Sequence, residues 1–123
     1  MDINMKKKIV LVGMPDMASV CLNRLVAEGF QIVALVPPSR SNPSNALISN
    51  FAKSLGVEVF NFEKSPNDPD FIGLISALEA DIGLICSYDK LLSKDFLATT
   101  KMGYINCHPS LLPHYRGANP YHH

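Results

Sequence analysis

Runs of apolar residues recur along the chain at intervals that suit short strands. The runs at residues 8–12, 30–36 and 81–86 are continuous and rich in branched side chains, which is typical of strands covered on both faces. Shorter runs at residues 57–60 and 104–108 predict two further strands. The pattern therefore predicts five strands, most of them buried.

Four segments between these runs carry apolar residues at helical spacing. They are residues 17–28, 46–55, 70–78 and 93–98. In the second segment, Leu47, Phe51 and Leu55 lie at i, i+4 and i+8 and predict its buried face. The other positions expected to face inward are Val20, Cys21, Leu25, Val26, Phe71, Leu74, Ile75 and Leu78.

The alternation of strands with helices predicts the fold class, a doubly wound α/β domain with a mainly parallel sheet. The 123 residues fit one domain and are enough to bury a core. The turn after the first predicted strand differs from the motif of dinucleotide-binding proteins. Residues 13–19 (GMPDMAS) hold a single glycine, so the phosphate-binding fingerprint is missing and NAD is not expected.

Composition narrows the class of protein further. Apolar residues make up 47% and charged residues 18%, as in soluble globular proteins, and no apolar run is long enough to cross a bilayer. The first residues lack the apolar stretch of a signal peptide, so a cytoplasmic location is expected. The 11 basic and 11 acidic residues cancel, so this segment offers no overall field for a polyanion.

Cysteines and histidines do not form a metal site in the sequence pattern. Cys21, Cys86 and Cys107 are odd in number and widely spaced, which suggests neither a disulfide framework nor a zinc site. His122 and His123 are adjacent and would not share a helix face. We therefore expect no bound metal.

Polar chemistry is concentrated after the last predicted strand. Asn106 and His108 are two residues apart on an extended segment, so their side chains point the same way. Pro109 keeps His108 extended and ends the strand. An imidazole can transfer a proton near neutral pH, and a carboxamide can donate hydrogen bonds to an oxygen that gains negative charge. The pair suits acyl-type transfer, although a loop histidine beside a turn asparagine would give the same pattern.

The motif NxHPSLLPxxRGAxP at residues 106–120 resembles the signature of formyltransferases that use 10-formyltetrahydrofolate, the family of methionyl-tRNA formyltransferase. The resemblance implies a Rossmann-like catalytic domain in which Asn106 polarises the formyl oxygen and His108 handles the proton. It also implies a third catalytic residue, an aspartate, and further strands beyond residue 123. Residues 1–123 are therefore expected to be a partial catalytic domain that is inactive by itself.

The same resemblance places the folate donor against the segment that follows residues 81–86. Its candidate contacts on this side are Tyr88, Lys90, Leu91 and Leu92. The motif loop supplies the other candidates, Ser110, Leu111, Leu112, Pro113, Arg116 and Gly117. Because ligands gather beyond the carboxyl ends of parallel strands, the two groups should share one cleft. Burial in the core remains an alternative for Leu91 and Leu92, and so does loop anchoring for Arg116.

The acceptor amine is left open among three classes by the resemblance. Methionyl-tRNA is preferred because the opening turn and the SLLPxYRGAxP stretch fit that branch. An amino sugar nucleotide is the runner-up, and glycinamide ribonucleotide is third. A hypothesis of another class is a folate-binding module without catalysis, since the orienting carboxylate is missing from these residues.

Overall fold

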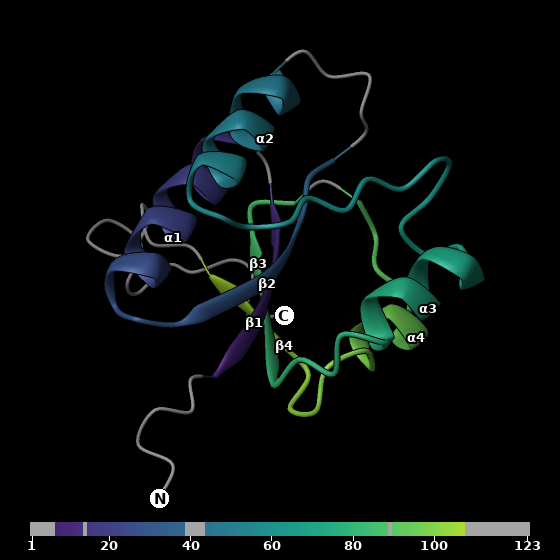
Figure 1. Ribbon diagram of the computed structural model, residues 1–123. Coiled ribbons are helices and arrows are strands. Elements are labelled where there is room, and N and C mark those ends of the chain that lie inside the picture. The colour runs from purple at the N-terminus through teal and green to yellow at the C-terminus, as the bar shows by residue number, and fades with distance from the viewer. Residues whose placement is uncertain (1–6, 14, 39–43, 89, 108–123) are drawn as a thin grey trace, which may run out of the picture.

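A computed structural model describes residues 7–13, 15–38, 44–88 and 90–107 of the chain. Within these residues, four parallel strands and four helices alternate in a three-layer arrangement (Figure 1). The strands are β1 (Lys8–Gly13), β2 (Gln31–Val36), β3 (Ile82–Cys86) and β4 (Tyr104–Cys107). The helices are α1 (Pro15–Ala27), α2 (Ser44–Ser54), α3 (Pro69–Ser76) and α4 (Lys94–Leu97).

The strand order β2-β1-β3-β4 brings all four carboxyl ends to one edge of the sheet. Gly13 pairs with Cys86 in register, and Cys86 pairs with Cys107 on the next strand. All the pairings are parallel, as the alternation of elements predicts. The predicted doubly wound α/β class is confirmed, because α1 and α2 cover one face of the sheet and α3 and α4 the other (Figure 1).

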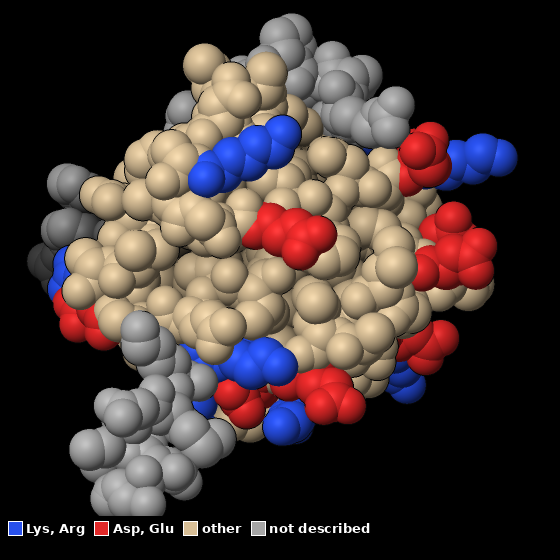
Figure 2. All heavy atoms as spheres, viewed as in Figure 1, with Lys and Arg blue, Asp and Glu red and all other residues tan. Residues whose placement is uncertain are grey.

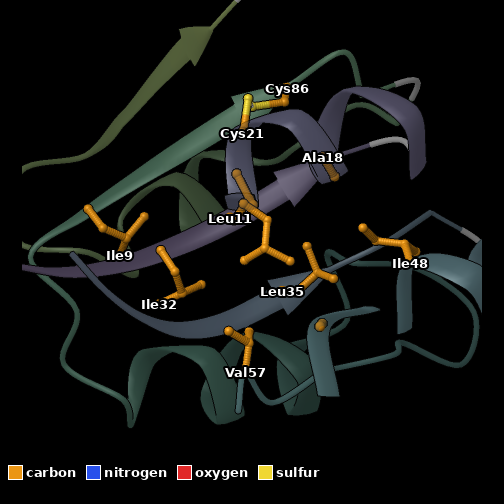
Figure 3. Close-up of a cluster of buried hydrophobic side chains, with 11 residues drawn as sticks. Ile9, Leu11, Ala18, Cys21, Ile32, Leu35, Ile48, Val57 and Cys86 are labelled. Atoms are coloured by element: carbon orange, nitrogen blue, oxygen red, sulfur yellow. The ribbon is translucent and has the colours of Figure 1, made fainter. Parts of the chain in front are cut away.

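Each face of the sheet carries its own buried cluster. The first cluster joins the sheet to α1 and α2, and its labelled members are shown in Figure 3. Within it, the thiol of Cys86 donates a hydrogen bond to Cys21 Sγ at 2.6 Å, which links β3 to α1. The second cluster lies between the sheet and α3 and α4, and its buried members are Val10, Val12, Ala34, Val36, Phe62, Phe71, Ile75, Ala80 and Phe96.

The prediction of a strand at residues 57–60 is wrong, because these residues form only a single bridge with β2. Val59 bridges to Leu35 in parallel, and backbone hydrogen bonds join Glu58 O to Leu35 N at 2.9 Å and Leu35 O to Phe60 N at 2.8 Å. Beyond this bridge, Phe62 is buried in the second cluster. The apolar run thus pairs with β2 at one residue and does not extend into a strand.

The buried face of α2 also differs from the expectation. Leu47 is 73% exposed, whereas Ile48 and Ala52 are buried and Phe51 is partly buried against them. The contact stripe therefore runs at i, i+3 and i+4 and uses a small residue, where the sequence pattern favoured the larger Leu47 and Leu55. Large apolar side chains are often left exposed because polar surface is limited.

Two further inward assignments are wrong for the same reason. Val20 in α1 and Leu74 in α3 are each 57% exposed. Ala18 and Leu22 in α1 are fully buried, and Ile75 takes the corresponding role in α3. The helices face the sheet through the stripe that gives the closest approach, and a shift of one position in that stripe exposes a neighbouring large residue.

Gly83 in β3 lies directly beneath the ring of Tyr104 in β4. The two residues are register partners, and a Cβ built on Gly83 would lie 2.1 Å from the Tyr104 ring. The ring also packs on Phe96, with ring centroids 5.5 Å apart, and its hydroxyl lies 2.8 Å from Thr99 Oγ1. The absence of a side chain at Gly83 is therefore what allows β4 to pack on β3 through its aromatic residue.

Replacing Gly83 by alanine should destabilise the fold by about 2 kcal/mol or more, because the added methyl group overlaps the buried Tyr104 ring. Gly73→Ala is the matched control, since nothing lies within 4 Å of its Cβ position and α3 gains a better helix former there. Urea unfolding of both variants checks this. A Gly83→Ala protein as stable as the wild type would contradict the packing argument.

Candidate functional site

The candidate site lies at the edge where the four strands end. β3 continues directly into residues 87–92, and β4 beside it carries Asn106 near its own carboxyl end. Asn106 pairs in register with Ile85, so it lies beside β3 two residues before Ser87. The two stretches that the sequence analysis expected to share a cleft therefore begin on adjacent strands at one edge.

Asn106 is exposed, and the face of the sheet that it occupies is fixed by Tyr104. The two residues are two positions apart on β4, so their side chains project to the same face. That face is the one covered by α3 and α4, because Tyr104 packs against the second cluster. Asn106 thus presents its carboxamide to solvent at the end of a strand that Tyr104 holds in place.

Tyr104 is held by a short chain of hydrogen bonds. The Thr99 hydroxyl donates to Phe96 O at 2.7 Å, which leaves its oxygen to accept from the Tyr104 hydroxyl at 2.8 Å. Burial raises the pKa of Tyr104 to about 12, against the partial effect of the Thr99 hydrogen bond. The phenol is therefore neutral at physiological pH and serves to anchor β4.

The segment after β3 starts with an unusual backbone conformation. Ser87 has a φ of 52°, which is uncommon for a residue with a side chain. Tyr88 follows, packs against the second cluster, and donates a hydrogen bond from its hydroxyl to Pro37 O at 3.1 Å. The sharp turn at Ser87 therefore directs the chain across the strand ends toward the loop that follows β2.

The rest of this segment is only lightly anchored by burial. Leu91 is 89% exposed and Lys90 is exposed as well, whereas Leu92 packs partly against the second cluster. Core burial is thus excluded for Leu91. Because Tyr88, Leu92 and Tyr104 all contact the same cluster, the segment and Asn106 lie on the same side of the sheet.

Asn67 reaches this segment from the turn before α3. Its Nδ2 donates to Leu91 O at 2.8 Å, and its Oδ1 accepts from Ser93 N at 2.8 Å. Asn67 is not distinguished by the sequence pattern, because residues 61–68 indicate only a polar turn. No local spacing relates Asn67 to residues that lie 24 and 26 positions further along the chain.

Five of the expected site residues can be placed, and they gather at the carboxyl edge. They are Tyr88, Lys90, Leu91, Leu92 and Asn106. The remaining expected residues lie outside the described part of the chain. They are His108, Ser110, Leu111, Leu112, Pro113, Arg116 and Gly117.

Charged residues of both signs occur on the visible surface, mostly along its lower and right margins in Figure 2. On the face shown in Figure 2, basic and acidic residues are interspersed among a majority of other residues, without a continuous stretch of one sign in the coloured part. No helix among the described residues is long and apolar enough to span a membrane. Likewise, the described ranges hold no group of three residues that could coordinate a metal ion.

Comparisons with known proteins identify the family to which the chain is related. The sequence profile of the formyl transferase family matches residues 6–123. A methionyl-tRNA formyltransferase of Roseiflexus sp. (strain RS-1) is 39% identical over 123 residues, covering 94% of this chain and 38% of the relative. One from Neisseria gonorrhoeae is 34% identical over 119 residues, covering 92% of this chain and 39% of the relative.

The fold and the position of the site define a Rossmann-like α/β domain whose polar groups lie beyond the carboxyl ends of its strands. The chain belongs to the formyl transferase family, as the match over residues 6–123 establishes. It spans a little over a third of the length of the curated relatives that it matches, 38% in the case of the Roseiflexus sp. enzyme.

Stability should fall in alkaline solution because of Tyr104. Its pKa is raised from 10.0 to about 12 by burial, so the unfolded chain loses the phenol proton before the folded chain does. The contribution is intact below pH 10 and is lost as the pH rises from about 10 to 12, by up to roughly 2 to 3 kcal/mol.

Urea unfolding between pH 9 and pH 11.5 measures this loss, with Tyr104→Phe as the control. The variant lacks the ionisable hydroxyl and should show a shallower decline, although it starts lower by about 1 kcal/mol for the lost hydrogen bond to Thr99. Parallel declines in the two proteins would show that another group controls alkaline unfolding.

Proposed function

We propose that the protein transfers the formyl group of 10-formyltetrahydrofolate to the amine of methionyl-tRNA. The observation that carries the proposal is the position of Asn106, an exposed carboxamide at the end of β4, beside the segment that follows β3. Membership of the formyl transferase family supports the reaction class. The relatives bear the name methionyl-tRNA formyltransferase, which supports the acceptor.

The described residues fit a folate at this edge. A pterin ring is flat, with one hydrogen-bonding rim and two apolar faces, and it suits an exposed backbone that carries an apolar side chain. The segment at residues 90–92 offers such a surface, since Leu91 is exposed and Leu92 is partly buried beneath it. Tyr88 closes the end nearest β2 through its hydrogen bond to Pro37 O.

In this proposal, the acceptor amine forms a bond to the formyl carbon, the bond from that carbon to N10 of the folate breaks, and tetrahydrofolate leaves with a proton on N10. The carboxamide of Asn106 donates hydrogen bonds to the formyl oxygen as that oxygen gains negative charge. The imidazole of His108 takes the proton that the attacking amine must lose. The motif at residues 106–120 is proposed to supply further contacts with the substrates, through Ser110, Leu111, Leu112, Pro113, Arg116 and Gly117.

The roles of the two catalytic groups differ in what they require of the fold. Hydrogen bonds to a developing charge are most effective when the donor needs no rearrangement. Asn106 meets this requirement because β4 is paired with β3 and anchored through Tyr104. Proton transfer requires a group whose pKa is near the working pH, which an imidazole has without any special environment.

The acceptor is tested by supplying the full-length protein with 10-formyltetrahydrofolate and one amine at a time. Methionyl-tRNA, a uridine-diphosphate amino sugar and glycinamide ribonucleotide represent the three candidate classes. A kcat/KM at least a thousandfold higher for methionyl-tRNA supports the proposal. Preference for another amine replaces the acceptor, and folate binding without transfer to any of them favours the non-catalytic module.

Asn106→Ala should lower kcat by roughly a hundredfold or more and leave the KM for the folate donor within about threefold, because the lost hydrogen bonds act mainly in the transition state. Asn106→Asp is the isosteric control, since its carboxylate keeps the shape but cannot donate to an oxyanion. It should be at least as impaired. A variant that mainly weakens folate binding would reassign Asn106 to ground-state recognition.

His108→Ala should lower turnover by roughly two to four orders of magnitude, because the attacking amine then loses its proton to water alone. The acidic limb of the pH profile of kcat/KM should also disappear, since that limb reports the protonation of the base. Steady-state assays from pH 5.5 to pH 9 measure both effects. Near-normal turnover would remove His108 from the mechanism.

A further inference from the structure

The carboxamide of Asn67 bridges two points of the segment that follows β3. Its Nδ2 donates to Leu91 O, and its Oδ1 accepts from Ser93 N, each at 2.8 Å. A carboxamide can make this pair of contacts because it carries a donor and an acceptor side by side. The distance between the Leu91 carbonyl and the Ser93 amide is therefore set by one planar group.

Asn67 is itself held in position from both directions. Its backbone N–H donates to Ser65 Oγ at 3.0 Å, and Asp68 N–H donates to Ser65 O at 3.2 Å, which fixes the turn. α3 begins at Pro69 directly after this turn, and the helix is anchored by the buried side chain of Phe71. Asn67 therefore projects from a hydrogen-bonded turn beside a buried helix toward a segment whose Leu91 is exposed.

The segment has few other ties between Tyr88 and α4. Leu91 and Lys90 are exposed, and Leu92 is only partly buried. The next anchor is Ser93, whose Oγ accepts from Phe96 N at 3.1 Å and caps α4. Because burial contributes so little here, the path of the backbone at residues 90–92 depends on polar contacts, and Asn67 makes two of them.

We propose that Asn67 is a positioning residue for the folate donor. This inference rests on the function proposed above, in which the donor lies against residues 90–92. Asn67 touches only the backbone of that segment, and it keeps Leu91 O and the chain around it in the arrangement that the donor meets. Without Asn67, the segment must be ordered when the donor binds, and that ordering weakens the affinity.

The experiment compares Asn67→Ala with the wild type in the full-length protein, using calorimetry with 5-formyltetrahydrofolate as an unreactive folate and steady-state kinetics with both substrates. The Kd of the folate and the KM of the donor should rise about tenfold, a difference of about 1.4 kcal/mol. The KM of the acceptor should stay within about twofold, and kcat at saturating donor within about threefold.

Two further variants make the comparison specific. Asn61→Ala is the matched control, because Asn61 is an exposed asparagine in the same connection, and it should behave as the wild type. Asn67→Asp retains an acceptor for Ser93 N but places a carboxylate oxygen against Leu91 O, so its folate Kd should rise at least as much as that of the alanine variant. It carries the test if Asn67→Ala does not fold.

The outcomes separate this inference from the function on which it rests. If the wild type binds no folate, the proposed function fails. If the wild type binds folate and Asn67→Ala binds it within twofold of the same Kd, only the positioning role fails. A parallel rise in the KM of both substrates, with a lowered melting temperature, would mean that Asn67 serves stability alone.

Discussion

The position of β3 between β1 and β4 is the constraint on which the rest of the structure depends. Its register with β1 brings Cys86 beside Gly13, and its register with β4 brings Cys86 beside Cys107. β3 therefore aligns its own carboxyl end with those of β1 and β4. It also starts the segment at residues 87–92 and supplies, at Gly83, the space in which the Tyr104 ring fixes β4. Both halves of the candidate site are therefore positioned by β3.

The two halves are built by different interactions, and each suits a different task. Asn106 belongs to a paired strand whose neighbour Tyr104 is packed against Phe96 and hydrogen-bonded to Thr99. Such a group can meet a developing charge without reorganisation. The segment at residues 90–92 is exposed at Leu91, and Asn67 holds its backbone through a hydrogen bond to Leu91 O. Exposed backbone of this kind leaves hydrogen-bonding groups available to a ligand, provided that something else defines its path.

The sequence predicts the sheet better than it predicts the surfaces of the helices. Continuous branched runs identify β1, β2 and β3, because a strand buried on both faces tolerates little else. The face of α2 was misassigned, because Leu47 and Ile48 are both plausible anchors and only the packing decides between them. The strand predicted at residues 57–60 is reduced to one bridge with β2, because pairing along a sheet edge depends on tertiary contacts that the apolar run itself does not reveal. In the site, the strand predicted at residues 104–108 is confirmed as β4, whereas the relation between Asn106 and His108 stays a prediction because His108 lies outside the described residues.

Asn67 marks the limit of what local patterns can reveal. Its function in the fold depends on two backbone atoms, and a backbone atom leaves no signature in the identity of the residue that carries it. Leu91 could be any residue and still present the same carbonyl to Asn67 Nδ2. A side chain that recognises backbone therefore constrains only its own position in the sequence. Only the structure reveals such residues. Asn67 lies at a place where the proposed ligand would also contact backbone atoms.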